Sequence, residues 1–176
     1  MPVPITINRA PVLTLWAAVV AERLGHDRDA ALTLGRAVAG LNAQTKARRL
    51  GIARPDPAAA AERGRVRAAA GATHVELLGR HVPVVKTADG LRAATDGRPA
   101  APESVERYLE SKFGEHLAAA RAAMTALARA IPKSELEERA FALYEAFRPA
   151  APEGKRGWGA KGVLDLARLA RLAKEP

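Results

Sequence analysis

The chain contains no cysteine and few aromatic residues, and both shortages limit what it can be. Without thiols, disulfide bonds, thiol catalysis and cysteine-ligated zinc or iron–sulfur sites are excluded, so we expect a reducing, cytoplasmic setting. Aromatic residues make up 4% of the 176 residues, although apolar residues make up 48% and many of these are alanine. This composition favours helices packed closely through small side chains around one main core, rather than a thick β-sandwich.

Long hydrophobic runs and known catalytic motifs are also missing. The one candidate for a membrane segment, residues 10–21, is far shorter than the ~20 residues that span a bilayer and leads directly into Glu22 and Arg23. We read it as a buried helix and expect no membrane partner. The histidines are scattered and lack the spacing of metal ligands, and nucleotide-binding glycine loops are absent. We therefore expect no metal, no cofactor and no enzymatic activity, although a site assembled from distant residues leaves no local motif.

Acidic residues are outnumbered, and the excess of positive charge is unevenly distributed. The net charge is +9 and the sequence pI is about 10.6. Residues 36–67 carry eight cations and two anions, residues 102–147 carry six cations and eight anions, and residues 148–176 carry seven cations and three anions. A GC-rich genome would also raise the arginine content, but it would not segregate charge along the chain. The segregation favours a polyanionic partner, DNA before RNA.

Apolar spacing predicts a mainly α protein, in which a compact multi-helix domain carries a small antiparallel β-hairpin and a C-terminal helical hairpin. Residues 1–99 form the basic helical domain, with Trp16 as a core anchor and a short strand or arm at the start. Residues 100–148 form the helical hairpin, either packed on the same core or joining a homodimer through residues 102–147. Within it, residues 102–130 are one helix or a helix kinked at Gly114. Residues 149–176 form a basic loop and a short helix from Val163.

The order of the elements in residues 10–95 resembles that of a winged helix-turn-helix domain. A basic helix over residues 57–70 precedes two valine-rich strands, residues 74–78 and 81–87, which Gly79-Arg80 joins as a two-residue turn. The resemblance implies that the helix over residues 57–70 enters the major groove of DNA and that the tip of the hairpin contacts the backbone.

Residues 29–54 join a helical apolar stripe to a run of cations. Gly40 and Asn42 tolerate left-handed backbone angles and predict a turn, with one helix to about Ala39 and another from about Ala43. Gly40-Leu41-Asn42, Thr45-Lys46-Ala47 and Leu50-Gly51-Ile52 resemble the helix-hairpin-helix and helix-two-turn-helix motifs over residues 36–52. Asn42 replaces the second glycine of the motif, and Ala47 comes one residue late. The resemblance implies that backbone N–H groups at the turn bind phosphate; the alternative is one unbroken surface helix.

The predicted function is nucleic-acid binding, mainly through backbone phosphates. The residues predicted to bind are cations near these elements, together with the turn residues Gly40 and Asn42: Arg36, Lys46, Arg48, Arg49, Arg54, Arg63, Arg65, Arg67, Arg80, Lys155, Arg156 and Lys161. Trp158 lies among the last three cations, in a glycine-rich loop that either contacts phosphate with a stacking aromatic or is pinned to the core. The alternatives are a helical protein–protein interaction or scaffold protein and an enzyme of unrecognised class.

Overall fold

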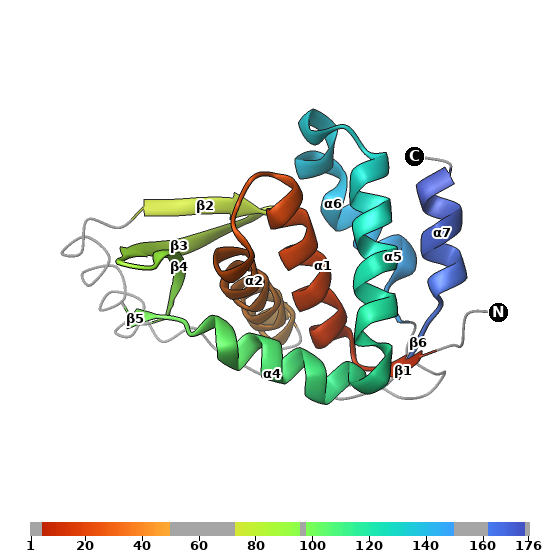
Figure 1. The fold of residues 1–176 in the computed structure, drawn as a ribbon, viewed down its shortest axis with the longest axis horizontal. Helices are drawn as coiled ribbons and strands as arrows, with labels where there is room; N and C mark the ends of the chain where they lie inside the picture. The colour runs from red at the N-terminus through yellow and green to blue at the C-terminus, as the bar shows by residue number, and fades with distance from the viewer. Residues whose placement is uncertain (1–4, 50–72, 96–97, 150–161, 175–176) are drawn as a thin grey trace.

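The computed structural model describes residues 5–49, 73–95, 98–149 and 162–174, without the side chains of residues 44–49, 73 and 95 (Figure 1). The fold is mainly α with small antiparallel sheets, as predicted. Its elements, in chain order, are β1 (Ile5–Ile7), α1 (Arg9–Arg23), α2 (Arg28–Arg49), β2 (Thr73–Leu77), β3 (Arg80–Thr87), β4 (Gly90–Thr95), β5 (Arg98–Pro99), α4 (Pro102–Phe113), the 3₁₀ turn η1 (Gly114–His116), α5 (Leu117–Ala130), α6 (Lys133–Phe147), β6 (Gly162–Leu164) and α7 (Leu166–Lys174).

Helix α1 is the centre of the fold. Every residue from Pro11 to Ala21 is buried, because this stretch has no charged residue and neighbours surround it. Helix α2 packs on one side of α1, and α5 and α6 pack on others (Figure 1). The approach of α2 is close at Gly35, where an added Cβ would clash with the carbonyl oxygen of Thr14 and lie 2.9 Å from the backbone nitrogen of Ala18. The absence of a side chain at Gly35 therefore sets the distance between the two helices.

The scarce aromatic residues gather where α6 meets α1. Trp16 is fully buried, as predicted, and its indole Nε1–H donates a hydrogen bond to the carbonyl oxygen of Ala140, at 2.9 Å. Its ring meets that of Phe147 edge-on, with centroids 5.3 Å apart, and Phe147 contacts Tyr144 in the same way. Burial raises the pKa of Tyr144 to about 12. One cluster of rings thus holds two segments that are distant in the sequence.

The larger sheet has the strand order β2-β3-β4-β5, and one face of it packs against α2 (Figure 1). Val82, Val84 and Ala93 form the buried part of that face. The tight turn between β2 and β3 is Leu78-Gly79 rather than the predicted Gly79-Arg80. Both of its residues have positive φ, 51° and 75°, which matches the twist of a two-residue hairpin and makes Arg80 the first residue of β3.

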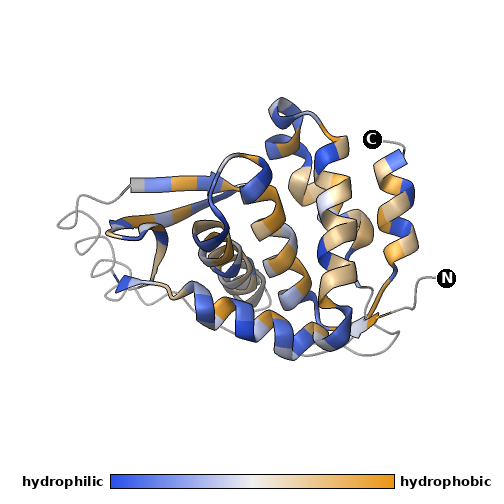
Figure 2. Cartoon of the chain, in the orientation of Figure 1, coloured by the Kyte–Doolittle hydropathy of each residue, from blue (hydrophilic) through white to orange (hydrophobic). Residues whose placement is uncertain are grey.

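The C-terminal helical hairpin closes the same core. Gly114, with φ of 56°, ends α4, so residues 102–130 form two helices rather than one. Apolar and hydrophilic residues are interspersed along these two helices (Figure 2), and the apolar stripe is buried in the monomer: Val105, Leu109, Phe113, Leu117, Ala120, Met124 and Leu127. The helix predicted from Val163 begins only at Leu166, because residues 162–164 form β6 and pair with β1.

Candidate nucleic-acid interface

Of the two alternatives for Gly40 and Asn42, the turn does not form and the unbroken helix does, because α2 runs from Arg28 to Arg49. Leu34 and Val38 are buried at helical spacing, and this packing outweighs the ~1 kcal/mol by which a glycine disfavours a helix. Backbone N–H groups inside a helix are bonded to carbonyls of the preceding turn, so those of residues 40–42 are not available to a phosphate. Any phosphate contact at this site must therefore come from side chains.

Helix α2 emerges from the core near Gly40. Residues 30–35 and the pair Val38 and Ala39 are buried, whereas Gly40 is exposed and residues 41–43 are half-buried. Lys46, Arg48 and Arg49 occupy the last turns of the helical backbone, and their side chains lie outside the part of the chain that the structure describes. Positive charge at the carboxyl end of a helix also complements the helix dipole, which gives these cations a stabilising role in any case.

The structure brings Asn42 and Arg80 together, although they are far apart in the sequence. The guanidinium Nη2 of Arg80 donates a hydrogen bond to Oδ1 of Asn42, at 3.1 Å, and both residues are half-buried. The β2–β3 turn is thereby held beside the carboxyl-terminal part of α2. Positions 46 and 49 follow position 42 at intervals of four and seven, which places them on the same side of the helix. Sequence reasoning named both partners but gave no signal that they meet.

Arg36 lies on α2, but it is engaged with α4. Its guanidinium stacks over the ring of Tyr108, 4.3 Å from the ring centroid, which is a cation–π contact. Burial raises the pKa of the Tyr108 hydroxyl, while the charge of Arg36 and its hydrogen bond to that hydroxyl act in the opposite direction. Arg36 therefore helps to dock α4 on α2, a role that the sequence did not reveal.

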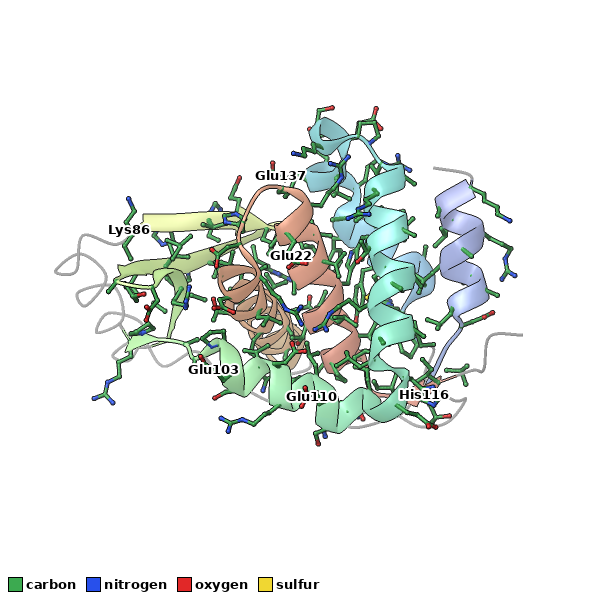
Figure 3. The ribbon with its side chains drawn as sticks, in the orientation of Figure 1. Glu22, Lys86, Glu103, Glu110, His116 and Glu137 are labelled. Atoms are coloured by element: carbon green, nitrogen blue, oxygen red, sulfur yellow. The ribbon has the colours of Figure 1, made fainter. Side chains whose placement is uncertain are left out.

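The other predicted cations cannot be placed. Seven of them lie outside the described residues: Arg54, Arg63, Arg65, Arg67, Lys155, Arg156 and Lys161. Two exposed cations on the larger sheet were missed by sequence reasoning, Lys86 of β3, labelled in Figure 3, and Arg98 of β5. The strand pattern gave no signal for Lys86, because period-two spacing puts it on the same face as the buried Val82 and Val84, where an apolar residue is expected.

A shallow groove of about 310 Å³ between the start of α2 and α4 has a different character. Carboxylates line much of it, with Asp29 on one side and Glu103 and Glu110 of α4 on the other; Figure 3 labels the two glutamates. Glu106, also in the lining, accepts hydrogen bonds from Arg28 at 3.3 Å and from Arg121 at 2.9 Å. Arg28 and Arg107 also line the groove, so four carboxylates face two guanidinium groups and the lining is acidic on balance. Glu106 ties three helices together.

Within the described ranges, no three histidine or acidic side chains are placed to hold a metal ion, and no helix has the length and apolar character needed to cross a membrane. No protein-family model, curated protein or solved structure matches the chain. The arrangement of its own residues is therefore the basis for a functional proposal.

Proposed function

We propose that the protein binds the phosphate backbone of DNA through the carboxyl-terminal part of α2 and the adjoining β2–β3 turn. This surface, which we call the α2–hairpin surface, consists of Asn42, Arg80 and positions 46 and 49. The observation that carries the proposal is the hydrogen bond from Arg80 to Asn42, at 3.1 Å, because it holds the cation of the β2–β3 turn beside the basic end of α2.

The chemistry of Arg80 suits a phosphate contact. A guanidinium has five N–H donors, so the bond to Asn42 leaves others to reach a phosphate oxygen. Asn42 would then orient Arg80, and the cations at the end of α2 would neutralise neighbouring phosphates. Each neutralised phosphate releases condensed counterions, so affinity should fall with salt by about 0.9 log units per log unit for each contact. Backbone contacts of this kind do not read sequence.

Several of the sequence predictions are retained in this proposal. Arg54, Arg63, Arg65 and Arg67, with the cations of residues 155–161, would extend the positive charge, and the protein would act in the cytoplasm by binding rather than by catalysis. The proposal does not require a dimer. The apolar side chains of residues 102–147, which could have formed a dimer interface, are packed inside the monomer. In the described part of the chain, Val163 is the single large apolar residue that is exposed.

The proposal is tested by measuring binding to labelled random-sequence DNA duplex, RNA duplex and single-stranded DNA across a salt series. Wild-type protein should bind duplex DNA, with affinity falling linearly on a log–log salt plot. The double variant Lys46→Glu, Arg49→Glu should bind more weakly, with a slope shallower by about 1.8 because two contacts are lost.

The matched control carries the same charge change on α4, where Arg107 and Lys112 are both exposed. Arg107→Glu, Lys112→Glu should keep the slope of the wild type. If no nucleic acid binds at low salt, the proposal is rejected, and equal losses in both variants would reduce it to a general charge effect. A preference for RNA or single strands would change the partner.

A further inference from the structure

Helix α7 presents a second basic surface. Its inner side packs on α5, with Leu169 fully buried and Leu172 half-buried. Arg168, Arg171 and Lys174 recur every three residues on the outer side, within an arc of about 120° of the helix surface, and all three are exposed. We call these three residues the α7 basic face (blue on α7 in Figure 2).

The positive charge of the α7 basic face is opposed at one point. Asp165 lies 3.8 Å from Arg171, whose side chain is 68% exposed, and an ion pair this open to solvent holds its partners weakly. The other carboxylate oxygen of Asp165 accepts a hydrogen bond from the backbone N–H of Ala167, at 3.0 Å, which fixes the start of the helix. The face is thus a fixed array of three cations near one compensating anion.

The α7 basic face is remote from the α2–hairpin surface. Helix α2 packs on α1, α1 on α5 and α5 on α7, and Figure 1 shows α7 as the outermost of these layers. Packed helices lie 8–10 Å apart, so the axis of α7 is about 24–30 Å from that of α2. This distance is roughly three Debye lengths at physiological salt, so the two surfaces attract polyanions independently.

We propose that the α7 basic face holds a second segment of duplex DNA, so that one protein molecule bridges two duplexes. This inference rests on the proposed function, because the α2–hairpin surface holds the first duplex. A lipid surface suits α7 less well, because a helix bound at a membrane inserts its apolar side, and the apolar side of α7 is packed against α5. Phosphates of DNA need only the charges that α7 presents outward.

The test uses one duplex fixed to beads and a second, fluorescent duplex in solution. Wild-type protein should retain the fluorescent duplex on the beads. The variant Arg168→Gln, Arg171→Gln, Lys174→Gln should no longer retain the fluorescent duplex. It should still bind a single duplex through the α2–hairpin surface, with the same slope of log affinity against log salt concentration as the wild type.

The matched control, Arg107→Gln, Lys112→Gln, Lys133→Gln, also removes three charges from exposed positions and should bridge like the wild type. Circular dichroism should show the same helix content in all three proteins. Light scattering at the assay concentration establishes whether a dimer, rather than a single molecule, joins the duplexes.

The outcomes separate the two proposals. If the wild type binds no duplex, the proposed function fails and bridging fails with it. If it binds a single duplex but retains no second one, or if the α7 variant bridges as well as the wild type, the bridging inference is overturned. A variant that bridges normally but no longer binds phosphatidylserine vesicles would assign the face to lipid instead.

Discussion

The two parts of α2 share one helical backbone but have opposite surroundings. From Arg28 to Ala39 the helix is packed between α1, α4 and the larger sheet, and most of its residues are buried. Its burial decreases at Gly40, which is exposed, and at residues 41–43, which are half-buried; the last turns of the helical backbone carry three cations. The difference shows that a charged helical end needs no fold of its own. The packed part fixes the direction of the helix, and the remainder presents charge at a defined place.

Each part of α2 contains a glycine, Gly35 in the packed part and Gly40 where the burial decreases, and alanine should have opposite effects at the two positions. At Gly35 an added methyl group would meet backbone atoms of Thr14 and Ala18, which cannot move without separating α1 from α2. Gly35→Ala should therefore destabilise the protein by about 3 kcal/mol, the upper end of the cost of overpacking. Urea unfolding measures this change. A loss below about 1 kcal/mol would show that the two helices are not in close contact here.

The tyrosines test the packed interior at high pH. The pKa of Tyr144 in the folded protein is about 12, raised from 10.0 mainly by burial, so folding holds this hydroxyl neutral. Its contribution to the free energy of unfolding is complete below pH 10. The contribution is lost as the pH rises towards 12, because the unfolded chain releases the proton first. The difference of two pKa units corresponds to about 2.7 kcal/mol. Urea unfolding across this range should show the loss in the wild type and in Tyr108→Phe. In Tyr144→Phe the loss should be markedly smaller.

A smaller effect is expected where α2 contacts the sheet. The buried Thr33 hydroxyl donates to the carbonyl oxygen of Ala30, at 2.8 Å, and accepts from the backbone N–H of Ala93, at 3.0 Å. Thr33→Val keeps the shape but leaves that N–H without its acceptor, at a cost of about 2 kcal/mol. Thr14→Val is the control, since the Thr14 hydroxyl bonds within its own helix, to Ala10. Equal losses in the two variants would show that the contact with the sheet adds nothing.

The smallest effect should have the opposite sign. Gly40 lies inside α2 with open space around it, so Gly40→Ala should stabilise the protein by about 0.5–1 kcal/mol. A left-handed glycine in a turn would instead make alanine unfavourable. Thermal or urea unfolding therefore distinguishes the continuous helix from a helix-hairpin-helix turn, and destabilisation by Gly40→Ala would contradict the continuous helix.

The sequence predicted the elements that depend on local chemistry. The uncharged stretch around Trp16 predicted a buried helix, and the valine-rich segments before and after Gly79 predicted the hairpin. It erred by one residue in placing the hairpin turn, because Leu78 adopts a positive φ that is uncommon for leucine. It left open whether the chain turns at Gly40, because glycine and asparagine permit a turn without requiring one.

By itself, the sequence determined the fold class, the burial of the helix around Trp16 and the concentration of positive charge in a few segments, since apolar spacing and net charge are local properties of the chain. The tertiary structure decided which charges meet. It joined Arg80 to Asn42, stacked Arg36 on Tyr108 and separated α7 from α2 by the two helices α1 and α5. Contacts between distant segments depend on how buried surfaces of α1, α2 and α5 fit one another. That fit is a property of the assembled core and has no local signature.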